Sequence, residues 1–253
     1  MTKHAPPTTE NQTTDLSSRS DVNDFLKKVA NAPAPTSGGT SRLLFAMDAT
    51  ASREPTWDHA CHLQGQMFAA TSDLGELHVQ LCHYGGFNHF RAGRWCASAT
   101  ELLDEMTRVR CLGGHTQIGR VLRHAQQEHS QNPLKAIIFV GDAIEENPDD
   151  LCHLAGQLGV LGIPLFMFQE GDHPGVQSVF KQMAQLSNGA FAPFNLASAS
   201  QLRELLSAVA VYATGGRAAL ERFEKVNQRS ALLTQQLRTC LWCGLSFCLS
   251  LRS

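Results

Sequence analysis

The sequence lacks a strong excess of charge of either sign. Its 21 basic and 23 acidic residues give a formal net charge of −2 at pH 7, so there is no bulk positive field to attract nucleic acid. It also lacks any run of about 18 consecutive apolar residues, the length that a membrane-spanning helix requires. These two absences predict that the chain binds neither nucleic acid nor a membrane.

A secretion signal is missing as well. The first residues, MTKHAPPTTENQTTDLSS, contain no charged n-region followed by an apolar h-region. Eight cysteines are present, and in a protein without an export signal we expect them to be mostly reduced. The sequence therefore predicts a cytoplasmic protein.

The first 41 residues have the composition of a tail with one short helix. Roughly the first 20 are rich in Thr, Ser, Pro and Asn, a composition that favours disorder. Apolar residues then recur at i, i+3, i+4 and i+7 from Val22 to Val29, which predicts an amphipathic helix that docks on the main domain. The prolines and glycines of residues 31–41 are typical of a linker.

From Arg42 to Thr214 the pattern alternates between strands and helices. Strands are expected near residues 43–47, 77–81, 90–96, 136–140, 163–168 and 190–194, and helices near 57–68, 100–109, 118–125, 149–158, 176–186 and 199–211. This alternation predicts an α/β domain with a doubly wound, mostly parallel sheet and helices on both faces. Residues 215–253 are predicted to form a further helix followed by an apolar tail that contains cysteines.

Three polar clusters stand where predicted strands end or a helix begins. Asp48, Thr50 and Ser52 follow the first strand, Thr116 precedes a helix, and Asp142 follows the strand near residues 136–140. Ligands of open parallel sheets bind beyond the carboxyl ends of the strands. Mg²⁺ requires about six oxygen ligands, which carboxylates, hydroxyls and waters can supply. We therefore predict a site for Mg²⁺ or Mn²⁺ built from these five residues, with an open position for an anionic oxygen.

These clusters also carry a family resemblance. The segments DATAS, GGHT and VGD resemble the three loops of a von Willebrand factor A (VWA) domain. The metal-ion-dependent adhesion site of that family reads Asp-x-Ser-x-Ser, then Thr, then Asp. Thr50 departs from the family's Ser but keeps the hydroxyl oxygen, while the other four residues match.

The resemblance implies a Rossmann-like sheet with one antiparallel edge strand. It also implies metal-mediated binding of a partner protein whose acidic side chain supplies a carboxylate to the ion. Many intracellular members of the family are adaptors or subunits of larger assemblies, so extracellular adhesion need not follow.

Other interpretations of the same residues remain open. Asp48, Thr50 and Ser52 could simply cap backbone N–H groups of a loop, and the metal site of a structural subunit could be vestigial. His115 and the acids at residues 145, 146, 149 and 150 could bind a partner or could be surface residues at the start of a helix.

An enzyme is the alternative to an interaction module. Haloacid-dehalogenase-type phosphatases also place an Asp at the end of the first strand, but they use Asp-x-Asp, and Thr50 cannot protonate a leaving group at neutral pH. Response-regulator receivers require an acidic pair where this chain has only Asp48. Neither the P-loop motif nor G-x-S-x-G occurs. A non-enzymatic module is the leading hypothesis, and a metal-assisted phosphoryl-transfer or hydrolase enzyme is the alternative.

Overall fold

The computed structural model describes residues 19–33, 40–54, 69–71, 76–194 and 199–248. The strands are β1 (Ser41–Asp48), β2 (Leu77–Gly85), β3 (His89–Cys96), β4 (Ala136–Gly141), β5 (Leu165–Glu170) and β6 (Phe191–Phe194). The helices are α1 (Arg19–Asn31), the short 3₁₀ helix η1 (Ala51–Arg53), α4 (Ala99–Thr107), α5 (Ile118–Gln131), α6 (Pro148–Val160), α7 (Pro174–Leu186) and α8 (Ala199–Cys248).

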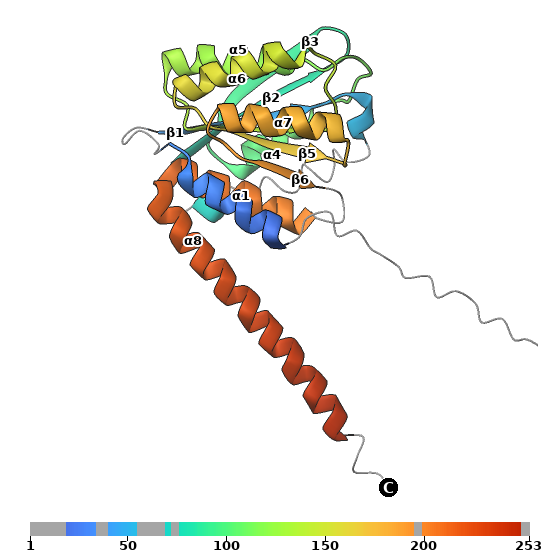
Figure 1. Cartoon of the computed structure of the whole chain (residues 1–253), viewed down its shortest axis with the longest axis vertical. Helices are drawn as coiled ribbons and strands as arrows, with labels where there is room; N and C mark the ends of the chain where they lie inside the picture. Colours follow the sequence, from blue (N-terminus) through green and yellow to red (C-terminus); the bar gives the residue numbers. More distant parts are fainter. Residues whose placement is uncertain (1–18, 34–39, 55–68, 72–75, 195–198, 249–253) are drawn as a thin grey trace, which may run out of the picture.

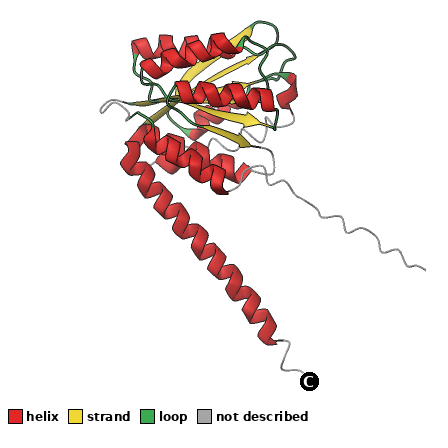
Figure 2. Ribbon diagram, viewed as in Figure 1, coloured by secondary structure: helices red, strands yellow, loops and turns green. Residues whose placement is uncertain are grey.

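The strands form one sheet in the order β3-β2-β1-β4-β5-β6, which Figure 2 shows in yellow. All neighbouring pairs are parallel except β2 and β3, which pair as an antiparallel hairpin. The predicted α/β fold, with its mostly parallel sheet and one antiparallel edge strand, is therefore confirmed. Because strand order reverses at β1, this strand has β2 on one side and β4 on the other, so the ligand site is expected at its carboxyl end.

The burial of the strands explains this arrangement. β1 and β4 are buried along almost their whole length, as central parallel strands covered on both faces should be. β3 is exposed or half-buried along nearly all of its length, which suits an edge strand.

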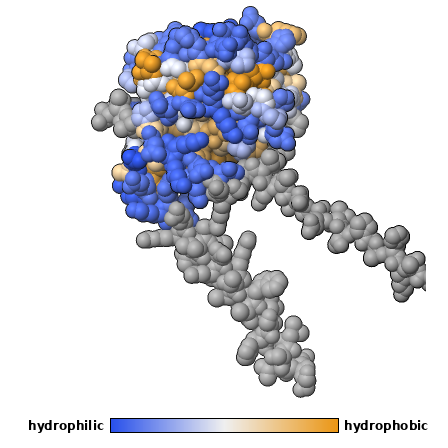
Figure 3. All heavy atoms as spheres, viewed as in Figure 1, coloured by the Kyte–Doolittle hydropathy of each residue, from blue (hydrophilic) through white to orange (hydrophobic). Residues whose placement is uncertain are grey.

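Helices cover both faces of the sheet (Figure 1). Helices α1, α4 and α8 contribute to the apolar core on one face, and α5, α6 and α7 contribute to the core on the other. The face of the molecule seen in Figure 3 is largely hydrophilic, with some apolar areas in its upper part. No helix in the described part of the chain combines the length and the apolar character needed to cross a membrane.

Helix α1 packs into the main core. The ring centroid of Phe25 lies 6.1 Å from that of Phe166 and 5.4 Å from that of Phe168, both on β5. The hydroxyl of Tyr212 on α8 donates to the carbonyl oxygen of Pro33, just after α1. The amphipathic helix predicted from Val22 to Val29 is thus present and docked on the sheet.

Some elements differ from the sequence-based prediction. β5 begins at Leu165 rather than at Ile163, because Pro164 has no N–H to donate to the ladder. The two helices predicted around residues 199–211 and past Gly216 are joined across a kink, where Gly216 has a φ of 65°. The helix predicted at 57–68, the tail at 1–18 and most of the linker at 34–39 lie outside the described residues.

Candidate metal site

Asp48 is the last residue of β1 and is fully buried. Its Oδ1 accepts a hydrogen bond of 2.7 Å from the backbone N–H of Thr50, and its Oδ2 accepts one of 3.2 Å from the Tyr84 hydroxyl. The pKa of Asp48 is raised, chiefly by burial and also by the nearby charge of Asp142. Burial and a second negative charge therefore destabilise the ionised form of the Asp48 carboxylate, and a bound cation would stabilise that form.

The hydroxyls of the first loop converge. Thr50 Oγ1 and Ser52 Oγ lie 3.0 Å apart at the start of η1. Thr50 is buried and Ser52 is exposed, so this pair of oxygens extends from the protein interior to solvent. The capping interpretation holds for Asp48, whose Oδ1 accepts a hydrogen bond from the Thr50 N–H. A role of the two hydroxyl oxygens as metal ligands stays a prediction.

Thr116 lies on the second loop and is bonded to the third. Its Oγ1 accepts a 2.9 Å hydrogen bond from the N–H of Glu145, and its own N–H donates to Glu145 Oε2 at 2.9 Å. The same carboxylate contacts His115 Nδ1 at 3.1 Å. Glu145 therefore fixes the orientation of Thr116, and the loop after β4 lies directly beside the loop that precedes α5.

Backbone hydrogen bonds join the second loop to the first loop and to the turn that follows β2. Leu112 N–H donates to the Ala49 carbonyl at 2.9 Å, and His115 N–H donates to the Gly86 carbonyl at 3.2 Å. A Cβ on Gly114 would lie only 1.9 Å from the Gly86 oxygen, so no larger residue fits there without movement of the backbone. This close approach is the physical reason for a glycine at position 114, the second glycine of the GGHT segment.

Asp142 completes the set of predicted residues. It follows β4, and its neighbour Gly141 lies next to Asp48, since a Cβ on Gly141 would be 3.5 Å from the Asp48 Cβ. Asp142 Oδ1 is buried and has no hydrogen-bond partner among the described residues. A buried carboxylate oxygen left unsatisfied is costly, so this atom fits a position that a cation would complete.

Arg53 is a participant that the sequence analysis missed. It directly follows the DATAS segment, is only 1% exposed and forms an ion pair with Glu170 at the end of β5. Burial lowers its pKa, while the charges of Asp142 and Asp48 oppose that shift. Arg53 thus places one fixed positive charge beside three carboxylates, and a basic residue adjoining the motif was the only signal of it in the sequence.

Glu146 has a role that the sequence analysis also missed. Its two carboxylate oxygens accept hydrogen bonds from the N–H groups of Ile118 at 2.6 Å and Gly119 at 2.8 Å. These are the first residues of α5, whose own N-cap residue makes no side-chain cap. Glu146 therefore stabilises a helix that is distant in sequence, where an acid also complements the helix dipole. Asp149 and Asp150 lie in the first turn of α6, as expected for a solvated helix start.

The predicted ligands are all oxygen atoms, which hard cations prefer. In the described part of the chain no group of three or more His, Cys, Asp or Glu side chains is arranged to hold a metal. The predicted ligands are instead two carboxylates and three hydroxyls, which suit Mg²⁺ or Mn²⁺ better than a soft metal. The structure shows the three loops in contact, and the convergence of all five side-chain oxygens on one ion remains a prediction.

Comparison with known proteins gives a result only at the level of structure. No protein-family model matches the sequence, and no curated protein does so either. Among solved structures, the VWA domain of SpRpn10 is similar with a TM-score of 0.53 and 14% identity, over 71% of this chain and 98% of that one.

Two further solved structures support the same assignment. A von Willebrand factor type A protein from Catenulispora acidiphila has a TM-score of 0.55 at 17% identity, over 70% of this chain and 44% of that one. Proximal thread matrix protein 1 from the mussel byssus, solved with a zinc-occupied MIDAS motif, has a TM-score of 0.52 at 16% identity, over 72% of this chain and 46% of that one. At these identities the likeness concerns the fold alone. The chain therefore has the fold of a von Willebrand factor A domain.

Proposed function

We propose that this chain is a non-enzymatic protein-interaction module that binds a partner through a divalent cation. Asp48, Thr50, Ser52, Thr116 and Asp142 would hold Mg²⁺ or Mn²⁺, and a carboxylate from the partner would fill the open position. The observation that carries the proposal is the buried Oδ1 of Asp142, which lacks a hydrogen-bond partner among the described residues beside a second carboxylate of raised pKa.

The charges around the site favour an anionic partner once the cation is bound. Asp48, Asp142 and Glu170 contribute three negative charges and Arg53 contributes one positive charge, so a divalent ion leaves no excess of negative charge. Hydroxyls are neutral ligands, so they stabilise the ion without repelling an incoming carboxylate. We therefore expect an acidic side chain of the partner to complete the coordination of the ion.

The rim of the site offers a surface for the rest of such a partner. Phe87 is 81% exposed and Leu112 is 45% exposed. Leu112 lies on the same loop as Thr116, and Phe87 follows Gly86, whose carbonyl oxygen accepts a hydrogen bond from that loop. The ring of Phe87 meets that of His115 edge-on, with centroids 5.5 Å apart. Exposed aromatic residues beside a polar anchor are frequent in interface hot spots, so this rim is where we expect the partner to pack.

The composition and the buried thiols support the predicted cellular location and kind of partner. A near-neutral charge gives no reason to expect nucleic acid as a partner. Cys82, Cys96 and Cys152 are buried thiols, which suits a reducing compartment such as the cytoplasm. An adaptor or a subunit of a larger assembly is the role that we propose there.

The competing function is a metal-assisted phosphoryl transfer or hydrolysis reaction. Thr50 stands where a phosphatase of this kind has its general acid, and a hydroxyl cannot supply the proton at neutral pH. We therefore expect no turnover of phosphate esters or nucleotides above background in the presence of Mg²⁺. Turnover that Asp48→Ala removes would favour the enzyme instead.

Capture of a partner by the tagged full-length chain tests the interaction proposal. We expect a partner that is retained with Mg²⁺, released by chelator and not captured by Asp48→Ala. Asp150→Asn removes an exposed carboxylate from the nearby start of α6 and serves as the matched control, which should retain the partner. A partner retained equally in chelator and by Asp48→Ala would contradict metal-mediated binding.

A further inference from the structure

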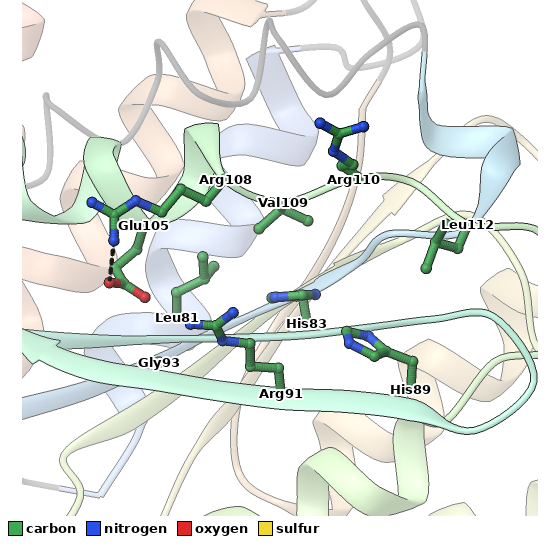
Figure 4. Close-up of a pocket in the computed structure, with 10 residues that line it drawn as sticks. All are labelled: Leu81, His83, His89, Arg91, Gly93, Glu105, Arg108, Val109, Arg110 and Leu112. Atoms are coloured by element: carbon green, nitrogen blue, oxygen red, sulfur yellow. Dashed lines mark ion pairs between the residues drawn. The ribbon is translucent and has the colours of Figure 1, made fainter.

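A cavity lies on the other side of the Leu112 loop from the candidate metal site, between the β2–β3 hairpin and the end of α4. Its volume is 240 Å³, which is below the range of about 300–1,000 Å³ typical of sites for drug-sized ligands. Figure 4 shows His83, His89 and Arg91 on the hairpin, facing the chain segment that carries Arg108, Val109 and Leu112. The cavity therefore has room for a small ligand such as a phosphate group.

The lining of this cavity is predominantly basic. His83, His89, Arg91, Arg108 and Arg110 all line it, and Glu105 is the single acidic residue that does so. The Glu105 carboxylate is already shared, since its Oε1 lies 3.4 Å from Arg94 Nε and 4.0 Å from Arg108 Nη1.

The charges of the two remaining arginines are not balanced. Arg91 and Arg110 form no ion pair with any residue in the described part of the chain. The cavity therefore has cationic groups in excess of the acid available to them.

His83 is the most informative residue of the lining. It is only 7% exposed and makes no hydrogen bond to any described residue, yet Figure 4 shows its ring directed into the space beneath the loop. Its ring centroid lies 5.8 Å from that of His89. Burial, together with His89 and Arg91, lowers the pKa of His83 to about 4. At pH 7 the ring is therefore a neutral imidazole, which can donate one hydrogen bond to an acceptor bound in the cavity.

We propose that this cavity binds a phosphate monoester group, with His83, His89 and Arg91 as its principal contacts. Arginine presents a planar fork that bonds two phosphate oxygens at once. Phosphate monoesters carry about −1.5 to −2 charges at pH 7, which matches several cationic groups better than a single carboxylate does. The site is distinct from the candidate metal site and does not depend on the proposed metal-mediated function.

Titration of the full-length chain by calorimetry tests this site. The ligands are inorganic phosphate, a phosphoserine peptide, its unphosphorylated serine counterpart and acetate. We expect saturable binding of the phosphate-bearing ligands and none of acetate or the serine peptide. Tighter binding of the phosphopeptide than of phosphate would identify a modified side chain as the source, and equal binding would identify free phosphate.

Variants assign that binding to the cavity. Arg91 lies on the exposed edge strand, so Arg91→Gln should leave the fold intact. The substitution should reduce phosphate affinity by at least about tenfold, the effect expected from the loss of one charge-assisted hydrogen bond. His83→Gln should do the same, and circular dichroism and thermal melts of both variants check that they fold. Arg123→Gln removes an exposed arginine of α5 and should bind as the wild type does. The proposal is overturned by an absence of saturable binding, by acetate binding as tightly as phosphate, or by equal affinity in Arg91→Gln and Arg123→Gln.

Discussion

The candidate metal site and the basic cavity, which lie on either side of the Leu112 loop, differ in the sign of their charge. At the carboxyl ends of β1, β4 and β5, the carboxylates of Asp48, Asp142 and Glu170 surround one arginine. Beneath the edge hairpin, basic side chains surround one glutamate that is already paired. The net charge of −2 conceals this separation. The charge of each local region therefore says more about its ligand than the net charge of the whole chain does.

The same loop supports both regions. Leu112 lines the basic cavity, and its N–H donates to the Ala49 carbonyl in the first loop of the metal site. The two regions are thus adjacent but built by different strand pairs. Substitutions should affect one region and spare the other, which the first of the following changes tests directly. Three further changes test the acidic region and its surroundings, in order of decreasing expected effect.

The largest effect is expected from Arg53→Met. The substitution leaves Glu170, Asp142 and Asp48 without their buried positive charge, and removing one partner of a buried ion pair costs about 3–5 kcal/mol. Chemical denaturation in chelator measures this loss, and Mg²⁺ should restore more stability to the variant than it adds to the wild type. Phosphate binding should be unchanged. A variant as stable as the wild type would show that Arg53 does not balance the acidic region.

Glu146→Gln should have a smaller effect on stability. It weakens the charge-assisted cap on α5 and should cost about 0.5–2 kcal/mol, as lost N-caps do. Asp150→Asn, an exposed acid in the first turn of α6, is the control and should change the unfolding free energy by less than about 0.5 kcal/mol. Equal effects of the two substitutions would mean that Glu146 is only a solvated surface acid.

The pH dependence of the acidic region has a defined sign. In chelator the folded protein holds the Asp48 proton more tightly than the unfolded chain does, because the folded pKa is raised above 3.8. The Asp48 contribution to unfolding free energy should therefore increase as pH falls through that raised pKa, and level off below 3.8.

With Mg²⁺ the sign reverses, because the ion binds the ionised carboxylate and its stabilising effect is lost as pH falls. Denaturation curves of the wild type and Asp48→Asn, each with Mg²⁺ and with chelator, isolate this contribution. Identical pH profiles for the two proteins would contradict the assignment.

The smallest effect on stability is expected from Phe87→Ala. The ring is exposed, so the unfolding free energy should change by less than about 0.5 kcal/mol, while capture of the metal-dependent partner should weaken. Thermal melts and capture assays measure the two quantities separately. Capture that is unaffected by the substitution would place the partner elsewhere.

Much of the fold was predictable because its signals are local. The apolar run from Leu43 to Met47 and the period of α5 depend only on neighbouring residues, and both elements were predicted. The continuation of α8 beyond Val211 was less predictable. Tyr212 in this part of the helix donates to the carbonyl oxygen of Pro33, a contact between distant parts of the chain.

For the site, sequence analysis brought together the loops that carry Asp48, Thr116 and Asp142, because parallel strands end at one edge of a sheet. It missed the roles of Arg53 and Glu146, which depend on partners more than 25 residues away. It also missed the basic cavity, since its residues are separated in sequence and form no motif. Periodicity and motif spacing reveal local structure, but they do not reveal which distant segments come into contact.

Calorimetric titration of the full-length chain with Mg²⁺ and Mn²⁺, in wild type and Asp48→Ala, tests the central claim most directly. The account predicts saturable binding by the wild type and at least about a hundredfold weaker binding by the variant, since even changes to residues that only support metal ligands cost 10–100-fold. Thermal melts in chelator should show that the variant remains folded. Equal affinity of the two folded proteins for the ion would contradict the claim that Asp48 is a metal ligand.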